Sequence, residues 1–316
     1  MLEPQRPALL ILIPLPTPFV AQLAQHYRVI EAFEGPSAAL WLRLRGQSVG
    51  AVLSNGSVGL SADQMDALPG LRLVSAFGAG YESIDLAAAR QRGIQVSHAP
   101  GINNATVADH ALMLMLALAR GIVPLDRAVK SGAWLSSRTE RPTLNGRRLG
   151  LVGIGNIGQQ IARRASGFDM DVAYHARSAR LELAYRHEAD LLALAEWADY
   201  LVLACPGGTA TRHLIKRPVL QALGPQGFIV NIARGSVLHT GDLIAALQAG
   251  EIAGAGLDVL EGEPEVPAEL CSMPQVLLTP HVSGRSPEAQ RAQLACLMAN
   301  LAACFAGQAL PNAVPN

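Results

Sequence analysis

The sequence predicts an α/β protein made of two doubly wound domains, the second inserted into the first. Its 316 residues exceed what one hydrophobic core usually organises, which indicates two domains. Half of the residues are apolar and only 4% are aromatic, a composition typical of helices packed on buried parallel sheets. Short apolar runs of strand length also alternate with amphipathic helical segments, which is the pattern of βαβ units.

The first domain is expected from residues 1–99, completed by the tail 286–316. Apolar runs predict four strands in it: Ala8–Ile13, Gly50–Leu53, Leu71–Ala76 and Gly93–Val96. Amphipathic segments predict the helices between them: Phe19–Gln25, Ser61–Leu68 and Leu86–Arg92. The Ala/Leu/Met-rich tail from Ser286 predicts one long helix that returns to pack on this domain.

The second domain is expected from residues 100–285, after Ala99-Pro100-Gly101 interrupts the alternation. It opens with a long helix, Asn104–Arg120, whose apolar surface is nearly continuous, so we expect it to be buried all round between domains or subunits. A second alternating set follows, and its predicted strands are Leu149–Val152, Val172–His175, Tyr200–Ala204, Gly227–Ile232, Gly254–Val259 and Val276–Leu278.

Charge and hydropathy argue against two classes of function. The 25 basic and 25 acidic residues balance, and no basic block exceeds the pair Arg147-Arg148, which argues against a nucleic-acid partner. The apolar stretch Leu9–Val20 is too short for a membrane span and is interrupted by three prolines, so a buried first strand explains it better than a signal peptide. The run Ala111–Ala119 ends at Arg120 and is typical of a buried helix. We therefore expect neither export nor a membrane partner.

The cysteine pattern favours a reducing compartment. The four cysteines show no CxxC spacing and no nearby histidine, so they are expected to be small buried residues in a cytoplasmic protein: Cys205, Cys271, Cys296 and Cys304.

A glycine-rich turn is the first candidate binding site. The strand Leu149–Val152 leads directly into Gly153-Ile154-Gly155-Asn156-Ile157-Gly158, which opens a helix. In this context GxGxxG is typical of dinucleotide binding: Gly153 permits the tight turn, Gly155 lets backbone approach a pyrophosphate, and Gly158 allows close helix packing. The helix N-terminus then supplies N–H groups for the phosphates. A tight turn without a ligand is the alternative.

The end of the next strand indicates which dinucleotide binds. NAD-specific sites place a carboxylate about 20 residues after the glycines, where it holds the ribose 2′-hydroxyl. No acid occurs from Val172 to Leu181; Arg177, Ser178 and Arg180 stand there instead and can bind a 2′-phosphate. The sequence therefore predicts NADP(H) in preference to NAD(H), with a solvated basic loop as the alternative.

Three ionisable residues follow strands of the second domain. Arg234, Glu263 and His281 come after the predicted strands that end near Ile232, Val259 and Leu278. Ligands of open α/β sheets gather at the carboxyl ends of strands, so the three are expected to converge. Each alone is common at a surface, but together they are the groups that ketone reduction needs: a guanidinium for the anionic substrate, an imidazole as proton donor and a carboxylate that orients it.

Several motifs in order resemble the D-isomer-specific 2-hydroxyacid dehydrogenase family, within it the glyoxylate/hydroxypyruvate and hydroxyphenylpyruvate reductase branch. They are the segment 75–85 (SAFGAGYESID), the glycine turn, the segment 254–259 (GAGLDV) and Pro280-His281. The resemblance implies Rossmann- and flavodoxin-like domains and a catalytic set of Arg234, Glu263 and His281. It also implies that the backbone N–H groups of Ala79 and Gly80 receive the substrate carboxylate and that Asp258 contacts the nicotinamide amide.

The resemblance implies further contacts and an assembly. Leu53 begins a stretch that lines the expected substrate pocket, and Cys205 and Pro206 begin the stretch that faces the cofactor. Family members are usually homodimers built around the helix corresponding to 104–120. Trp134 resembles a tryptophan that reaches the partner's active site in some members, with an ordinary packed tryptophan as the alternative.

The expected activity is NADPH-dependent reduction of a small 2-keto acid to the D-2-hydroxy acid, with His281 as general acid. The substrate is expected to be of the glyoxylate/hydroxypyruvate type, and an aromatic keto acid such as hydroxyphenylpyruvate is the alternative. A formate dehydrogenase is disfavoured because that branch has Gln where this chain has Glu263. A phosphoglycerate dehydrogenase stays open, and a dinucleotide-sensing binding protein is a remote alternative that would not need the catalytic set. No metal is expected.

Overall fold

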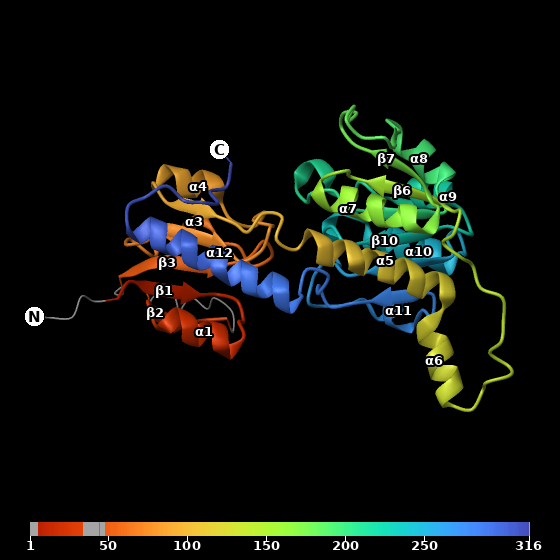
Figure 1. The fold of residues 1–316 in the computed structure, drawn as a ribbon, viewed down its shortest axis with the longest axis horizontal. Helices are drawn as coiled ribbons and strands as arrows, with labels where there is room; N and C mark the ends of the chain where they lie inside the picture. Colours follow the sequence, from red (N-terminus) through yellow and green to blue (C-terminus); the bar gives the residue numbers. More distant parts are fainter. Residues whose placement is uncertain (1–5, 34–43, 45–47, 316) are drawn as a thin grey trace, which may run out of the picture. The chain divides into compact units, whose positions relative to one another are not determined.

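The computed structural model describes residues 6–33, 44 and 48–315, and the chain divides into two compact units. Unit 1 comprises Met1–Asn103 with Ser286–Asn316, and unit 2 comprises Asn104–Arg285. Each unit is built around its own parallel sheet with helices on both faces, so the predicted fold class is confirmed (Figure 1).

The sheet of unit 1 has five parallel strands in the order β2-β1-β3-β4-β5. The strands are β1 (Ala8–Ile11), β2 (Arg28–Glu31), β3 (Val49–Ser54), β4 (Leu73–Ala76) and β5 (Gln95–Ser97). β1 and β4 are buried along their whole length, which is why they were readable as continuous apolar runs. β2 was not predicted: it lies at the edge and exposes Arg28 and Glu31, so it carries no apolar pattern.

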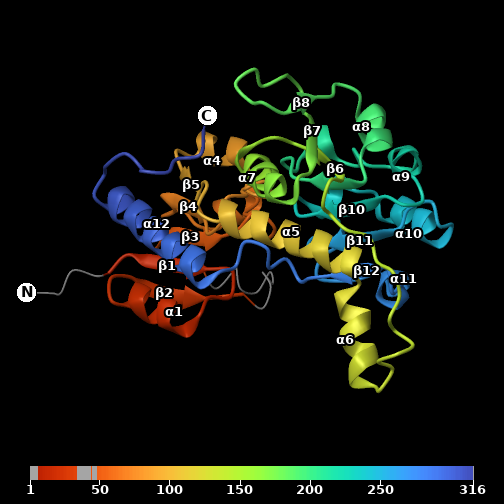
Figure 2. The ribbon, with the colours of Figure 1, turned by 45° about the vertical axis from the view of Figure 1, so that its right-hand side comes forward.

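Helices cover both faces of this sheet. α1 (Thr17–Ala24) and α12 (Pro287–Phe305) share a core with the strand residues of one face, among them Leu9, Ile11 and Leu53 (Figure 2). α3 (Ala62–Asp66) and α4 (Leu86–Gln91) pack on the other face. The tail helix therefore packs on unit 1 as predicted. Side-chain caps begin three of these helices, and the capping residues are Ser61, Asp85 and Ser286.

The sheet of unit 2 has seven parallel strands in the order β12-β11-β10-β9-β6-β7-β8. The strands are β6 (Arg148–Val152), β7 (Asp171–His175), β8 (Arg186–His187), β9 (Tyr200–Leu203), β10 (Phe228–Asn231), β11 (Gly254–Leu257) and β12 (Val276–Leu278). The strand order reverses between β6 and β9, and ligands of such sheets bind beyond the carboxyl ends of the strands at this point. The glycine turn that follows β6 lies there.

The helices of unit 2 also form two layers. α5 (Asn104–Arg120) and α7 (Asn156–Ala165) pack side by side on one face (Figure 1). α8 (Leu191–Trp197), α9 (Arg217–Leu223), α10 (Thr240–Gln248) and α11 (Ala268–Ser272) contribute to the core of the other face. Three short 3₁₀ turns connect elements: η1 (Ser166–Phe168), η2 (Thr209–Thr211) and η3 (Gly235–Val237).

The described residues of this chain do not bury the helix 104–120 all round, and its burial against a second subunit stays a prediction. Met113 of α5 is 42% exposed, and it lines a shallow apolar groove together with Leu112, Leu116 and Phe168. The apolar run shows that the helix is apolar on most sides, but it does not show which side packs against the rest of unit 2. α6 (Ile122–Lys130) follows and exposes Ile122, Val123 and Val129.

Among the described residues, no single helix is long and apolar enough to cross a membrane. Only α5 and α6 taken together have the length and composition, and their axes bend by 57° at the break between them.

Candidate active site

The glycine turn has the geometry that dinucleotide binding requires. Gly153 has a φ of +102°, and a Cβ there would lie 2.7 Å from the backbone nitrogen of Cys205. A Cβ at Gly158 would lie 2.3 Å from the carbonyl oxygen of Gly153, so only glycine lets α7 approach the turn. A Cβ at Gly155 meets nothing within 4 Å, which leaves open space beside the turn.

The first turn of α7 is also open to a ligand. Gly155 is its N-cap and provides no side-chain hydrogen bond to the first N–H groups of the helix. Asn156, the first residue of α7, is exposed, and Ile157 is half-buried. Since unsatisfied N–H groups at a helix N-terminus attract anions, this turn fits the pyrophosphate of a dinucleotide.

The basic loop lies at the carboxyl end of the strand next to the turn. β7 pairs with β6, and the N–H of Gly153 donates to the carbonyl oxygen of His175, the last residue of β7. Arg177, Ser178 and Arg180 follow, and all three are exposed. Arg180 is the more restrained arginine: its backbone N–H donates to the Tyr174 hydroxyl at 2.7 Å, and its guanidinium lies 3.5 Å from Glu182.

Cys205 is half-buried, and its backbone is in direct contact with the glycine turn. Burial raises the pKa of its thiol to about 11, so it is protonated at neutral pH and is not a nucleophile. Pro206 is the next residue and is exposed.

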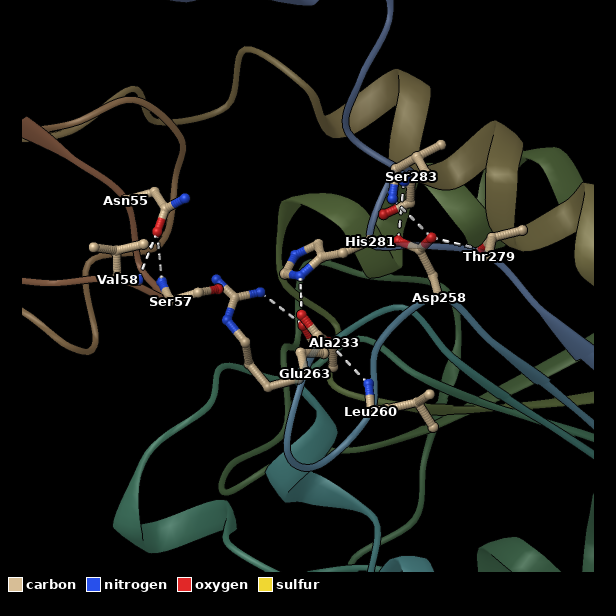
Figure 3. Close-up of polar contacts among 12 residues, drawn as sticks. Asn55, Ser57, Val58, Ala233, Asp258, Leu260, Glu263, Thr279, His281 and Ser283 are labelled. Carbon is tan, nitrogen blue, oxygen red and sulfur yellow. Dashed lines mark hydrogen bonds and ion pairs between the residues drawn. The ribbon is translucent and has the colours of Figure 1, made fainter. Parts of the chain in front are cut away.

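Three neighbouring strands carry the catalytic candidates at their carboxyl ends. Arg234 follows β10, Glu263 follows β11 and His281 follows β12, and these strands are adjacent in the sheet. Nδ1 of His281 lies 2.8 Å from Oε2 of Glu263, and the other oxygen of Glu263 accepts the backbone N–H of Leu260 at 2.9 Å (Figure 3). The guanidinium of Arg234 donates to the carbonyl oxygen of Ala233 at 2.7 Å.

The electrostatics keep the glutamate of this pair ionised. Burial raises the pKa of Glu263, but the hydrogen bonds from His281 and from the Leu260 amide outweigh it and lower the pKa below its usual value. Because an ionised carboxylate only accepts hydrogen bonds, Nδ1 of His281 carries the proton between them. The other ring nitrogen, Nε2, is then the atom that can exchange a proton with a substrate. The imidazole is 39% exposed, so it is accessible.

His281 also has an unusual backbone. Its φ is +52°, in the left-handed region that few non-glycine residues adopt. Its N–H donates to the carbonyl oxygen of Asp258 at 2.8 Å, which anchors the turn. Strained conformations of this kind persist where surrounding contacts hold them, and they cluster at functional sites.

Asp258 anchors this turn a second time through its side chain. Its carboxylate accepts hydrogen bonds from the Thr279 hydroxyl and from the backbone N–H groups of Val282 and Ser283, at 2.6, 2.9 and 2.9 Å (Figure 3). Burial raises the pKa of Asp258, but these hydrogen bonds outweigh it and lower the pKa. Asp258 is only 1% exposed, which leaves almost no surface for the nicotinamide contact that the resemblance implied. In the structure it holds the turn of His281.

His110 of α5 completes this network, and sequence reasoning missed it. Its Nε2 lies 2.9 Å from the Thr279 hydroxyl and 3.6 Å from the Asp258 carboxylate. Since the Thr279 proton goes to Asp258, the Thr279 oxygen accepts from His110, which therefore carries a proton on Nε2. No local pattern marks such a contact, because it joins residues from α5, β11 and the turn after β12.

The substrate candidates of unit 1 lie in the segment after β4. The N–H groups of Ala79 and Gly80 donate no hydrogen bond among the described residues, so both are available to an anion. The carbonyl oxygen of Ala79 contacts Nδ1 of His98 at 2.9 Å, which fixes the orientation of this peptide.

The assignment of Leu53 to a substrate pocket is corrected by the structure. Leu53 has no exposed surface and packs in the core of unit 1. The loop after β3, residues 55–59, forms a tight turn in which Oδ1 of Asn55 accepts the N–H groups of Ser57 and Val58 at 2.9 and 2.7 Å (Figure 3). The expected pocket stretch therefore begins as a core strand.

Trp134 is 63% exposed, and its neighbour Leu135 is 76% exposed. The alternative prediction for Trp134, an ordinary packed tryptophan, does not fit this exposure. The part of the chain that the structure describes leaves more than half of this side chain uncovered.

Comparison with known proteins gives the family. The family model described as "D-isomer specific 2-hydroxyacid dehydrogenase, NAD binding domain" matches residues 112–283, more than half of the chain. The chain belongs to the D-isomer-specific 2-hydroxyacid dehydrogenases. It is therefore an oxidoreductase that uses a nicotinamide dinucleotide, and the predicted family and enzyme class are confirmed.

Three relatives of this dehydrogenase cover nearly its whole length. Hydroxyphenylpyruvate reductase of Plectranthus scutellarioides and glyoxylate/hydroxypyruvate reductase A of Arabidopsis thaliana are each 36% identical over 302 residues, covering 95% of this chain and 96% of theirs. The solved structure of the NADPH-dependent glyoxylate/hydroxypyruvate reductase of Sinorhizobium meliloti, in complex with NADP and malonate, is 33% identical. It superposes with a TM-score of 0.88 and covers 98% of this chain and 97% of that one. These relatives support 2-keto acid reduction as the reaction of this dehydrogenase.

Proposed function

We propose that this dehydrogenase reduces a small 2-keto acid of the glyoxylate or hydroxypyruvate type to the D-2-hydroxy acid, with His281 as the general acid. The single observation that supports this most is the 2.8 Å contact between His281 Nδ1 and Glu263 Oε2 at the carboxyl edge of the sheet. The carboxylate keeps a proton on Nδ1, so Nε2 is the nitrogen that gives its proton to the substrate carbonyl oxygen.

The other groups hold the substrate and orient its carbonyl. A nicotinamide dinucleotide supplies the hydride to the keto carbon when it is bound. The guanidinium of Arg234 binds the carboxylate or carbonyl oxygen of the keto acid. The backbone N–H groups of Ala79 and Gly80 receive the substrate carboxylate. In this proposal residues 1–99 with 286–316 form the substrate domain, and residues 100–285 form the dinucleotide-binding domain.

The proposal is tested by a substrate panel. NADPH oxidation is followed with glyoxylate, hydroxypyruvate, pyruvate, phenylpyruvate, hydroxyphenylpyruvate and 2-ketoglutarate, and the hydroxy acid product is analysed for chirality. We expect the highest kcat/KM with glyoxylate or hydroxypyruvate and a D product where the product is chiral. A hydroxyphenylpyruvate maximum would instead favour the second candidate, an aromatic keto acid reductase, which the Plectranthus relative supports. Absence of turnover with every keto acid would contradict both.

NADPH is the proposed reductant. Arg177 and Ser178 are exposed beside the glycine turn, and no carboxylate stands at the end of β7 to hold a ribose 2′-hydroxyl. The Sinorhizobium relative, described as NADPH-dependent and bound to NADP, agrees with this preference. Comparable kcat/KM values for NADPH and NADH would contradict it.

A homodimer through the 104–120 region is also part of the proposal. The uncovered groove of α5 and the exposed apolar residues of α6 are surfaces that a second copy would bury. Trp134 would then reach the partner's substrate site. Light scattering of the purified protein tests the dimer, and a monomer at micromolar concentration would contradict it.

Cytoplasmic localisation completes the proposal. The four cysteines are free, which is typical of a reducing compartment. The expectation that all four are buried holds for Cys304 alone, because Cys271 is exposed and Cys205 and Cys296 are half-buried.

A further inference from the structure

A second glutamate–histidine pair lies on the same turn as the first. Glu261 precedes Glu263 by two residues, and its Oε1 lies 2.6 Å from Nε2 of His213. Its other oxygen accepts both the N–H and the hydroxyl of Thr240, at 3.0 and 2.9 Å. The side chains of His213 and Glu261 are 23% and 24% exposed, so this pair is less accessible than the pair of His281 and Glu263.

The contacts of Glu261 reach the segment that carries Arg234. The backbone N–H of His213 donates to the carbonyl oxygen of Ser236 at 2.7 Å, and the hydrogen bonds continue from Ile215 to Val237. A Cβ at Gly235 would lie 2.0 Å from the carbonyl group of Leu260. The turn that follows Arg234 is therefore in close backbone contact with the turn that bears Glu261.

Glu261 is linked to the proton donor through Leu260 and Glu263. The N–H of Leu260, its neighbour in the chain, donates to Oε1 of Glu263, and Oε2 of Glu263 accepts from His281. A displacement of Glu261 moves this N–H and with it the carboxylate that orients the imidazole. His213 itself adopts a left-handed backbone with a φ of +50°. Its contacts with Glu261 and with the carbonyl oxygen of Ser236 hold this conformation.

Two further polar residues, His239 and Asp242, lie beside the pair of His213 and Glu261. The ring of His239 lies 4.7 Å from that of His213 in an edge-on arrangement, and Nδ1 of His239 lies 3.0 Å from Asp242. Burial raises the pKa of Glu261, but the hydrogen bonds from Thr240 and His213 outweigh it and lower the pKa. Among the described residues, no group of three or more His, Cys, Asp or Glu side chains can hold a metal ion, so a metal does not explain the cluster.

We propose that Glu261, held by His213 and Thr240, is a positioning residue for the reaction: it sets the backbone turn that aims Glu263 at His281 and keeps it in register with the turn of Arg234. This inference rests on the proposed function. Glu261 touches neither substrate nor cofactor in it.

The experiment compares Glu261→Ala with Glu261→Gln. Alanine removes every contact, and we expect kcat to fall about 10-fold or more, because small displacements of catalytic groups cost this much or more. The KM for NADPH changes less than about 2-fold, because Glu261 touches neither the substrate nor the cofactor in this proposal. Glutamine keeps its oxygen on Thr240 and its amide on His213, so kcat stays within about 3-fold of the parent.

Two further variants separate positioning from stability. Glu251→Ala removes a comparable glutamate contact, 2.8 Å from Arg217, in the same unit, and it should leave kcat unchanged. His213→Asn keeps a residue that tolerates the left-handed backbone but is too short to reach Glu261, and it leaves the Thr240 contacts in place. If Glu261→Ala does not fold, His213→Asn replaces it in the test, and we expect a smaller fall in kcat with the KM for NADPH again unchanged.

Hydrogen exchange gives a readout independent of turnover. We expect the Leu260 amide to exchange faster in Glu261→Ala than in Glu251→Ala. A folded Glu261→Ala with unchanged kcat and unchanged Leu260 exchange would overturn this inference alone, provided that the parent enzyme is active and depends on His281. A parent that reduces no keto acid, or that does not need His281, would instead overturn the proposed function.

Discussion

The carboxyl edge of the unit 2 sheet has two regions that are built in opposite ways. Beyond β6 and β7 the candidate cofactor site consists of backbone N–H groups at a glycine turn and of exposed side chains such as Arg177. Beyond β10, β11 and β12 the candidate catalytic groups are side chains braced by other side chains, with Asp258 almost fully buried behind them.

The difference follows from what each region has to recognise. A pyrophosphate is large and charged, so a glycine turn and a helix N-terminus suffice for it, and the adjacent arginines can be exchanged without disturbing a core. A proton donor must be held at one position and in one tautomer, which requires a supporting network. Substitutions in the braced region should therefore change stability and turnover, whereas those in the cofactor region should change only cofactor choice.

The largest effect is expected for Asp258→Asn. The side-chain amide of Asn would direct its N–H₂ group at backbone N–H groups that donate to the carboxylate in the parent protein. These buried donors would then be unpaired, which costs about 3 kcal/mol of folding free energy. Urea unfolding of parent and variant measures this cost. Asp199→Asn is the matched control, because its partner Arg148 is half-exposed, and it should cost about 1 kcal/mol or less.

The cost of Asp258→Asn should also depend on pH. The pKa of Asp258 is lowered in the folded protein, so its stabilising contribution is fully present above the unfolded-state pKa, about 3.9. It is lost as pH falls through the lower folded-state pKa. The difference in stability between parent and variant should be constant above about pH 5 and shrink below about pH 4. A difference that grows in acid would contradict the assignment.

An intermediate effect is expected for Glu263→Gln. The amide can still accept a hydrogen bond from Nδ1 of His281, but this neutral hydrogen bond is weaker than the one to a carboxylate and holds the ring less firmly. We expect kcat to fall by about 10- to 100-fold, as stopped-flow or steady-state rates would show. An unchanged kcat would show that Glu263 does not support the donor.

The smallest effect is expected for Arg177→Ala. Loss of one charge-assisted hydrogen bond to a 2′-phosphate should raise the KM for NADPH about 10-fold and leave the KM for NADH within about 2-fold. Arg180→Ala is the matched comparison, and it should matter less because Glu182 lies 3.5 Å from its guanidinium. Equal changes for both cofactors in Arg177→Ala would mean that this arginine does not read the phosphate.

Much of the fold was predictable because buried parallel strands leave uninterrupted apolar runs. Those runs located most strands of both sheets, and the long helix 104–120 was predicted with the bounds that the structure gives. The edge strands β2 and β8 were missed, since half-exposed strands carry mixed residues. The uncovered face of α5 was also missed, because an apolar run gives no information on which face its neighbours reach.

The candidate site was predictable where its chemistry is local. The glycine turn and the strand-end positions of Arg234, Glu263 and His281 follow from short motifs and from strand order. His110 and His213 were not predictable, and Asp258 was named only as a cofactor contact, because all three brace the site through contacts between distant segments. Leu53 was misassigned because a strand end and a pocket wall look alike in sequence, and burial separates them.

The most direct test of the central claim is the turnover of His281→Asn. Asparagine tolerates the left-handed backbone at this position but cannot donate the proton. With NADPH and the best keto acid of the panel, we predict that kcat falls about 100-fold or more, while the dissociation constant for NADPH stays within about 2-fold of the parent. Near-full turnover in a folded His281→Asn would contradict the assignment of His281 as the proton donor.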